Sequence, residues 1–78
     1  MTLDNARMNK TYKIVGFFGG HNLAQRLYSM GLYVGAKVRI KSVAPMRGPL
    51  IIQNVDNDIQ IALGRGIISK IEVAESSE

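Results

Sequence analysis

One stretch of the chain, residues 19–32, has the hydrophobic spacing of an amphipathic helix. Leu23 and Leu27 are four residues apart, and Met30 follows three residues after Leu27. Residues at these intervals lie on one face of a helix, so the pattern predicts an apolar stripe over about two to three turns. A helix this short is marginal in water by itself. We therefore expect the stripe to pack against the rest of the protein.

Polar and glycine residues bound this predicted helix. Asn22 is the candidate N-cap because its side-chain oxygen can accept from a free N–H of the first turn, and Gln25 stands in the capping-box position. Gly31 directly follows the periodic residues, where a left-handed residue often ends a helix. His21 is a candidate metal ligand or partner contact, but no second His and no Cys accompanies it, which favours a turn residue.

The other hydrophobic segments alternate at the period of β-strands. In the clearest one, residues expected in the core alternate with cations expected in solvent: Val38 and Ile40 against Lys37, Arg39 and Lys41. Clusters of Gly, Pro, Asn and Asp separate the segments and mark turns. The expected strands are residues 10–18, 37–41, 50–55, 58–63 and 67–73, with a break or short helical turn at 64–66.

Five short strands and one helix in 78 residues indicate a mainly β fold. We expect a small SH3-like five-stranded barrel with the short α-helix inserted between the first and second strands, because closing a sheet on itself reduces its exposed edges. An OB-fold is disfavoured, since its helix comes later in the chain. The whole chain, residues 1–78, is expected to form one domain. Edges left open in such a barrel could pair into a weak homo-oligomer.

Composition narrows the range of functions. The chain has no Cys, which excludes disulfides, thiolate metal sites and cysteine nucleophiles. One His and six carboxylates make a poor catalytic inventory, so we expect no enzyme, no cofactor and no small-molecule substrate. No apolar run approaches the ~20 residues that span a bilayer, and the N-terminal residues do not look like a signal peptide. A cytoplasmic protein without membrane insertion is the default expectation.

A mild basic excess leaves the choice of partner open. The net charge is +4 with a pI near 9.8, and the cations of residues 37–41 form a stripe on one strand face. This stripe could face nucleic acid phosphates or an acidic protein, and it could equally be a solvated face. The scarcity of aromatic residues disfavours a base-stacking surface for RNA.

Several motifs together resemble the FeoA family of small accessory proteins in bacterial ferrous iron transport. A Gly-Gly-His triplet precedes the helix, the helix ends in an R-L-x-x-M-G-L-x-x-G pattern, and a Pro/Gly turn and a closing I-x-V follow. Asn9 stands where the family can have glycine, and Val34 where it usually has proline. The matching residues are Gly19, Gly20, His21, Arg26, Leu27, Met30, Gly31, Leu32, Gly35, Pro45, Gly48, Pro49, Ile71 and Val73.

The resemblance implies an SH3-like barrel and a partner, the FeoB permease, contacted through its cytoplasmic GTP-binding domain or other cytoplasmic segments. We expect a non-enzymatic adaptor that binds through the helix and the loop after it. Leu32 and Tyr33 would provide an apolar anchor with a polar tip. The alternatives are a nucleic-acid-binding barrel using Lys37, Arg39 and Lys41, or a metal-sensing module. The expected partner-binding residues are His21, Arg26, Met30, Leu32 and Tyr33.

Overall fold

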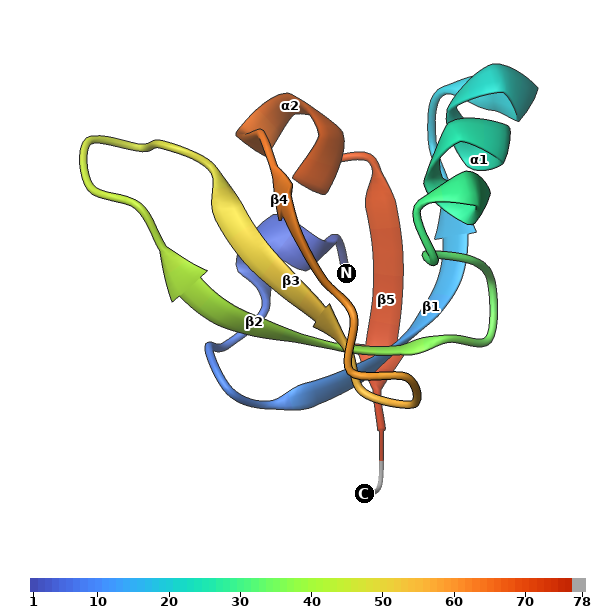
Figure 1. Ribbon diagram of the computed structural model, residues 1–78. Coiled ribbons are helices and arrows are strands. Elements are labelled where there is room, and N and C mark those ends of the chain that lie inside the picture. The colour runs from blue at the N-terminus through green and yellow to red at the C-terminus, as the bar shows by residue number, and fades with distance from the viewer. Residues whose placement is uncertain (77–78) are drawn as a thin grey trace.

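The computed structural model describes residues 1–76 as one curved sheet with two short α-helices and a 3₁₀ turn (Figure 1). The helix that follows the first strand stands beside the sheet, and the N-terminus lies near β5. The mainly β fold with a helix between the first two strands is thus confirmed. The elements are η1 (Leu3–Asn5), β1 (Thr11–Phe17), α1 (Gly20–Ser29), β2 (Lys37–Val43), β3 (Leu50–Asn54), β4 (Gln60–Leu63), α2 (Arg65–Ile68) and β5 (Ile71–Glu75).

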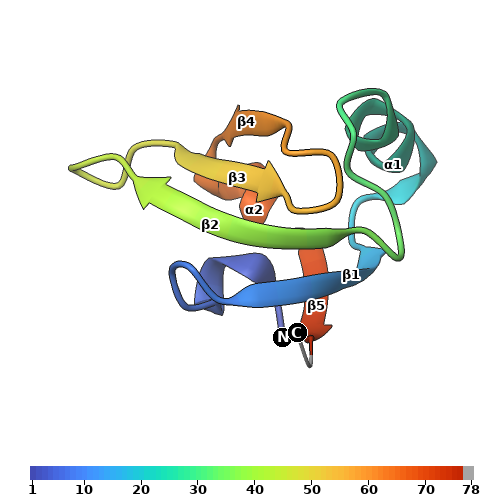
Figure 2. The same cartoon turned by 60° about the horizontal axis from the view of Figure 1, so that its bottom comes forward.

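The five strands form one antiparallel sheet in the order β4-β3-β2-β1-β5. The pairing register shifts between Ile14 and Gly16 in β1, and between Ile40 and Ser42 in β2. An extra residue on one strand of a pair bends that strand and increases its twist. These bends wrap the sheet around a core (Figure 2). Because β4 and β5 are edge strands that do not pair with each other, the barrel is open along one side.

The core lies inside the curved sheet and is closed by residues of α1, α2 and η1. In β2 the burial alternates as the sequence predicts, with Val38 and Ile40 buried and the three cations half-buried or exposed. Leu23 and Leu27 of α1 are buried, so the apolar stripe packs inward. The buried apolar residues are Leu3, Tyr12, Ile14, Leu23, Leu27, Leu32, Ala36, Val38, Ile40, Leu50, Ile52, Leu63, Ile68, Ile71 and Val73.

The start of α1 differs from the prediction. The helix begins at Gly20 with Gly19 as its N-cap and no side-chain cap, so Asn22 lies inside the first turn. Gly19 has φ 123°, and a Cβ there would come within 2.9 Å of Leu23 Cδ2. The tight turn at Gly19 therefore begins the helix before Asn22 can cap it.

The end of the chain also differs. Residues 67–68 belong to α2 rather than to the last strand, which begins at Ile71. The amides of Ile67 and Ile68 both donate to Gly64 O at 3.1 Å, and this turn places Ile68 in the core. Ile59 lies in the strand expected over residues 58–63, but β4 begins one residue after it, at Gln60, and Ile59 is exposed.

Candidate functional site

The loop after α1 is held in place by a hydrogen-bonded helix end. Gly31 has φ 92° and donates its N–H to Tyr28 O at 3.0 Å, while Leu32 N–H donates to Leu27 O at 2.8 Å. These two bonds and the left-handed glycine define a Schellman motif, which also buries the residue after the glycine against the helix. Gly31 therefore ends the helix as predicted, and Leu32 turns into the core.

Two further contacts fix this loop to the sheet. The Asn54 side chain is fully buried at the end of β3, and its Nδ2 donates to Gly31 O at 2.8 Å. Gly35, with φ 97°, donates its N–H to Ile14 O at 2.8 Å. The backbone between these two points is therefore tied to both β3 and β1.

The structure corrects the expectation for Leu32. Its side chain is 0% exposed and belongs to the core, so it offers no anchor to a partner. The neighbouring Tyr33 and Met30 are half-buried and pack against the core from outside. A double substitution of Leu32 and Tyr33 therefore tests the core as much as any surface.

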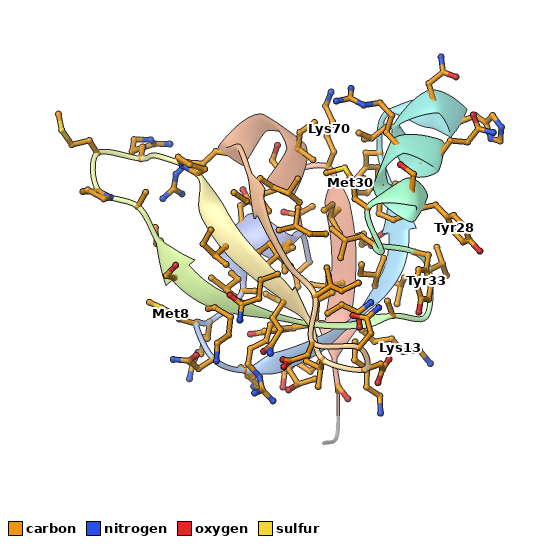
Figure 3. All side chains as sticks on the ribbon, viewed as in Figure 1. Met8, Lys13, Tyr28, Met30, Tyr33 and Lys70 are labelled. Carbon is orange, nitrogen blue, oxygen red and sulfur yellow. The ribbon has the colours of Figure 1, made fainter. Side chains whose placement is uncertain are left out.

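The remaining predicted residues divide between two sides of α1. His21 lies two turns before Tyr28 and so shares its side of the helix, whereas Arg26 and Met30 are one turn apart on another side. In Figure 3 Met30 points toward α2 and Lys70, while Tyr28 and Tyr33 lie on the side of α1 away from α2. The structure does not join these residues into one site.

Tyr28 and Tyr33 form the most prominent exposed aromatic pair. Their ring centroids are 5.7 Å apart at an interplanar angle of 53°, and Tyr28 is 69% exposed. Val34, 61% exposed, extends the pair along the loop. We call Tyr28, Tyr33 and Val34 the tyrosine surface. Sequence reasoning chose Tyr33 but missed Tyr28, which the helical spacing from His21 could have indicated.

The predicted basic stripe is present on the outer face of β2 and is wider than expected. Lys13 of β1 is exposed and pairs directly across from Lys37, a cation that sequence reasoning missed. Like charges in this arrangement disfavour folding slightly. The guanidinium of Arg39 already makes hydrogen bonds within the protein, since its Nη2 and Nε donate to Thr11 Oγ1 at 2.7 and 3.3 Å. Lys41 is exposed.

Carboxylates are distributed very unevenly along the chain. Residues 5–55 contain eight Lys and Arg residues and no Asp or Glu. At the far end of the sheet, Lys10 Nζ lies 2.7 Å from Glu75 Oε1. This hydrogen bond and the charge of Lys10 lower the pKa of Glu75 from its ordinary value of 4.5. α1 therefore carries one cation, Arg26, and no acidic residue.

Residues 1–76 show little that could serve metal or substrate chemistry. No group of three or more His, Asp or Glu side chains in this range is placed to hold a metal ion, and no pocket is found. His21 is exposed at the start of α1. Within the same range, no helix is long and apolar enough to cross a bilayer.

Comparison with known proteins connects this geometry to a family. The FeoA domain model matches residues 1–75. The chain belongs to the FeoA domain family. The resemblance in the helix and loop motifs is thereby confirmed, and membership supports a role in ferrous iron transport. Asn9, where family members can have glycine, has φ 65°, a conformation that Asn tolerates better than most residues.

Individual FeoA relatives agree with this assignment. A protein of Methanocaldococcus jannaschii, named "Putative Fe(2+) transport protein A", is 37% identical over 57 residues. That match covers 73% of this chain and 65% of the relative, so the chain spans slightly less than two thirds of its length. A crystal structure of an "Iron Uptake Regulatory Protein (FeoA)" superposes with a TM-score of 0.82 at 29% identity, over 96% of this chain and 95% of that one.

More distant structures share the fold alone. The FeoA protein of Chlorobium tepidum has a TM-score of 0.86 at 21% identity, covering 99% of this chain and 71% of that one. The ScaR protein with bound Zn²⁺ has a TM-score of 0.83 at 21% identity, and the match covers 97% of this chain but 37% of ScaR. FeoA-like and ScaR-like chains thus use one SH3-like architecture at low sequence identity.

Proposed function

We propose that this chain is a non-enzymatic accessory protein of ferrous iron uptake that binds the FeoB permease in the cytoplasm. Membership of the FeoA family supports the transport role, and the name of the Methanocaldococcus jannaschii relative points the same way. The described residues offer surfaces rather than a pocket, which favours a protein partner over a small-molecule substrate.

The tyrosine surface is the observation that carries the proposal. Tyrosine is enriched among residues that dominate binding energy, because its ring buries a large apolar area at low entropic cost while its hydroxyl can donate a hydrogen bond. Tyr28 lies near the end of α1 with its side chain exposed, so the core does not require it. Its ring contacts that of Tyr33, which belongs to the loop that the Schellman motif and Asn54 hold in place. His21 lies on the same side of α1 and belongs to the proposed surface.

Tyr28→Ala tests this assignment. We expect it to weaken binding to FeoB tenfold or more, about 1.4 kcal/mol, with no loss of folded structure. Met46→Ala is the matched control, since Met46 is a large apolar side chain that is 97% exposed on the distant β2–β3 turn. Affinity is measured with the soluble GTP-binding domain of FeoB and with full-length permease in detergent. Equal affinity of the two variants refutes the tyrosine surface.

A salt titration of binding separates the adaptor from a nucleic-acid-binding barrel. Lys13 widens the basic stripe beyond the three predicted cations Lys37, Arg39 and Lys41, which is the one observation favouring that alternative. Binding of nucleic acid by this stripe would fall steeply with salt, because each neutralised phosphate releases a counterion. The loss of FeoB affinity that Tyr28→Ala causes is expected to be nearly the same at low and high salt, because the tyrosine surface carries no charge.

A further inference from the structure

The open sheet has two edges, and its own chain covers only one of them. Along β5, Thr2 pairs with Glu72 in an isolated bridge, and Val73 N–H donates to Met1 O at 2.8 Å. The Met1 amino group donates back to Val73 O at 3.3 Å. The N-terminal residues therefore act as a short extra strand on β5. At β4, the other edge, the sheet order places no strand beyond the pairing with β3.

Two residues of β4 direct their backbone N–H and C=O groups away from β3. Asn54 N–H donates to Ile59 O at 2.8 Å, which makes the pair Asn54–Ile59 a hydrogen-bonded one. Hydrogen-bonded and non-hydrogen-bonded pairs alternate in an antiparallel ladder. The backbone groups of Ile61 and Leu63 therefore also point toward β3, where they pair with Ile52 and Leu50. Gln60 and Ala62 fall between them. Their N–H and C=O groups point away from β3 toward the free edge.

This edge lacks the usual protection against pairing. Natural edge strands commonly carry charged residues, prolines or bulges that block another strand. β4 reads Gln-Ile-Ala-Leu, with no charge and no proline, and its register with β3 runs without a shift. Figures 1 and 2 show no element lying along its outer side. The backbone of β4 is therefore available as a template for one more strand.

Half-buried apolar side chains come from β4 itself, from α2 and from the end of α1. They are Ile61, Ile67 and Met30, which pack against the outside of the core. Met30 points toward α2 and Lys70 in Figure 3. An added strand would cover these apolar atoms with alternate side chains.

The charges on the elements around β4 favour an acidic occupant. Arg65 begins α2 two residues after the end of β4, and its Nε is buried without a hydrogen-bond partner among residues 1–76. Arg26 shares a side of α1 with Met30, and Lys70 leads into β5. Residues 59–71 contain no Asp or Glu. A segment carrying carboxylates would neutralise these cations.

We infer that β4 accepts an extended, acidic segment of the protein partner as a sixth strand. The backbone of Gln60 and Ala62 supplies the ladder hydrogen bonds, the apolar side chains Met30, Ile61 and Ile67 receive alternate residues, and Arg65 and Lys70 face its carboxylates. The inference rests on the proposed function for the identity of the partner, FeoB, but it uses a surface separate from the tyrosine surface.

Hydrogen exchange on the complex of the full chain with FeoB in detergent tests the backbone part. In the free protein we expect the amides of Gln60 and Ala62 to exchange quickly in D₂O, and those of Ile61 and Leu63 to be protected by β3. On binding, we expect the peptide covering β4 to take up two fewer deuterons. If FeoB binds and Tyr28→Ala weakens it while these two amides still exchange freely, the proposed function stands and the sixth strand is refuted. Absence of any FeoB binding overturns both.

Variants test the same edge from the other side. Ala62→Pro removes one outward N–H, at an edge position where proline is tolerated, and Ala62→Ser keeps it as the matched control. Proline is expected to weaken FeoB binding tenfold or more and serine to leave it unchanged. Lys70→Gln is expected to weaken binding about threefold, and the same substitution at Lys41 on the outer face of β2 is the control. A dimer that protects Gln60 and Ala62 without FeoB would assign the edge to a second copy and overturn the inference.

Discussion

Asn54→Ala is expected to destabilise the protein more than any other single polar substitution in the described part of the chain. The Asn54 side chain joins the end of β3 to the end of α1, because its Nδ2 donates to Gly31 O at 2.8 Å. Its Oδ1 also accepts from Asp56 N–H at 3.0 Å and so shapes the turn toward β4. Alanine removes both bonds at a position that is 0% exposed.

The cost follows from what each partner loses. Gly31 O is left half-buried without its donor, which costs about 1–3 kcal/mol, and the bond from Asp56 contributes about 0.5–1.5 kcal/mol. Because Asp56 is exposed, water can replace that second bond. A loss of about 1–4.5 kcal/mol is expected, depending on how fully water replaces the second bond, against a total stability of about 4–12 kcal/mol for a domain of this size. The melting temperature should fall by about 4–8 °C for each kcal/mol lost.

Urea unfolding followed by circular dichroism measures the effect. Asn57→Ala is the matched control, since Asn57 also accepts a backbone N–H, from Ile59 at 3.1 Å, but is exposed. Its loss should stay within about 0.5 kcal/mol. Asn54→Asp should not rescue the protein at neutral pH, because a carboxylate cannot donate to Gly31 O. A loss below about 1 kcal/mol for Asn54→Ala, or one equal to that of Asn57→Ala, refutes the reasoning.

Two further predictions concern the core and the pH response. Leu32→Ala should cost about 2–5 kcal/mol in urea unfolding, because it leaves a cavity at the helix end, while Val34→Ala two residues on should change stability little. Glu75→Gln should destabilise slightly at neutral pH. Since Lys10 lowers the pKa of Glu75 in the folded state, this contribution is present above pH 4.5 and disappears as the carboxyl is protonated below it. If the difference in unfolding free energy between Glu75→Gln and wild type persists at pH 3, or if 1 M salt leaves it unchanged, the ion-pair account is contradicted.

Most of the fold could be predicted because its signals are local. The alternation of Val38 and Ile40 with cations and the helical spacing of Leu23 and Leu27 each need only a few neighbouring residues. Gly31 was identified by its place after the periodic residues. The start of the helix was harder to predict, because Lys70, far along the chain, packs so close to Gly19 that a side chain there would crowd it.

The candidate site was less predictable because it depends on long-range geometry. Leu32, Tyr33 and Val34 are three consecutive apolar residues, and nothing local says which one the Schellman motif buries. Lys13 joins the basic stripe only through its register with Lys37 on another strand. The free edge of β4 is likewise a property of the strand order, and no segment of sequence carries it.

The motif that identifies the family is largely a device for ending a helix. Leu27 is buried and accepts the bond that closes the turn, Gly31 takes the left-handed conformation, Leu32 fills the core, and Gly35 ties the loop to β1. Each of these roles holds the loop in place, and none presents a side chain to a partner. Proteins can therefore share this architecture at low sequence identity, as the superposition on ScaR at 21% identity illustrates.

It follows that function in this chain is to be sought at the positions that the motif leaves free. Tyr28 lies inside the motif sequence but points out of the fold, and Met30 caps the end of the helix and points toward α2. A rigid helix end with exposed residues on two sides can present a tyrosine surface and border a strand-accepting edge at once. Substitutions at the motif's buried positions should thus abolish binding through unfolding, and only those at exposed positions can reveal which partner surface is used.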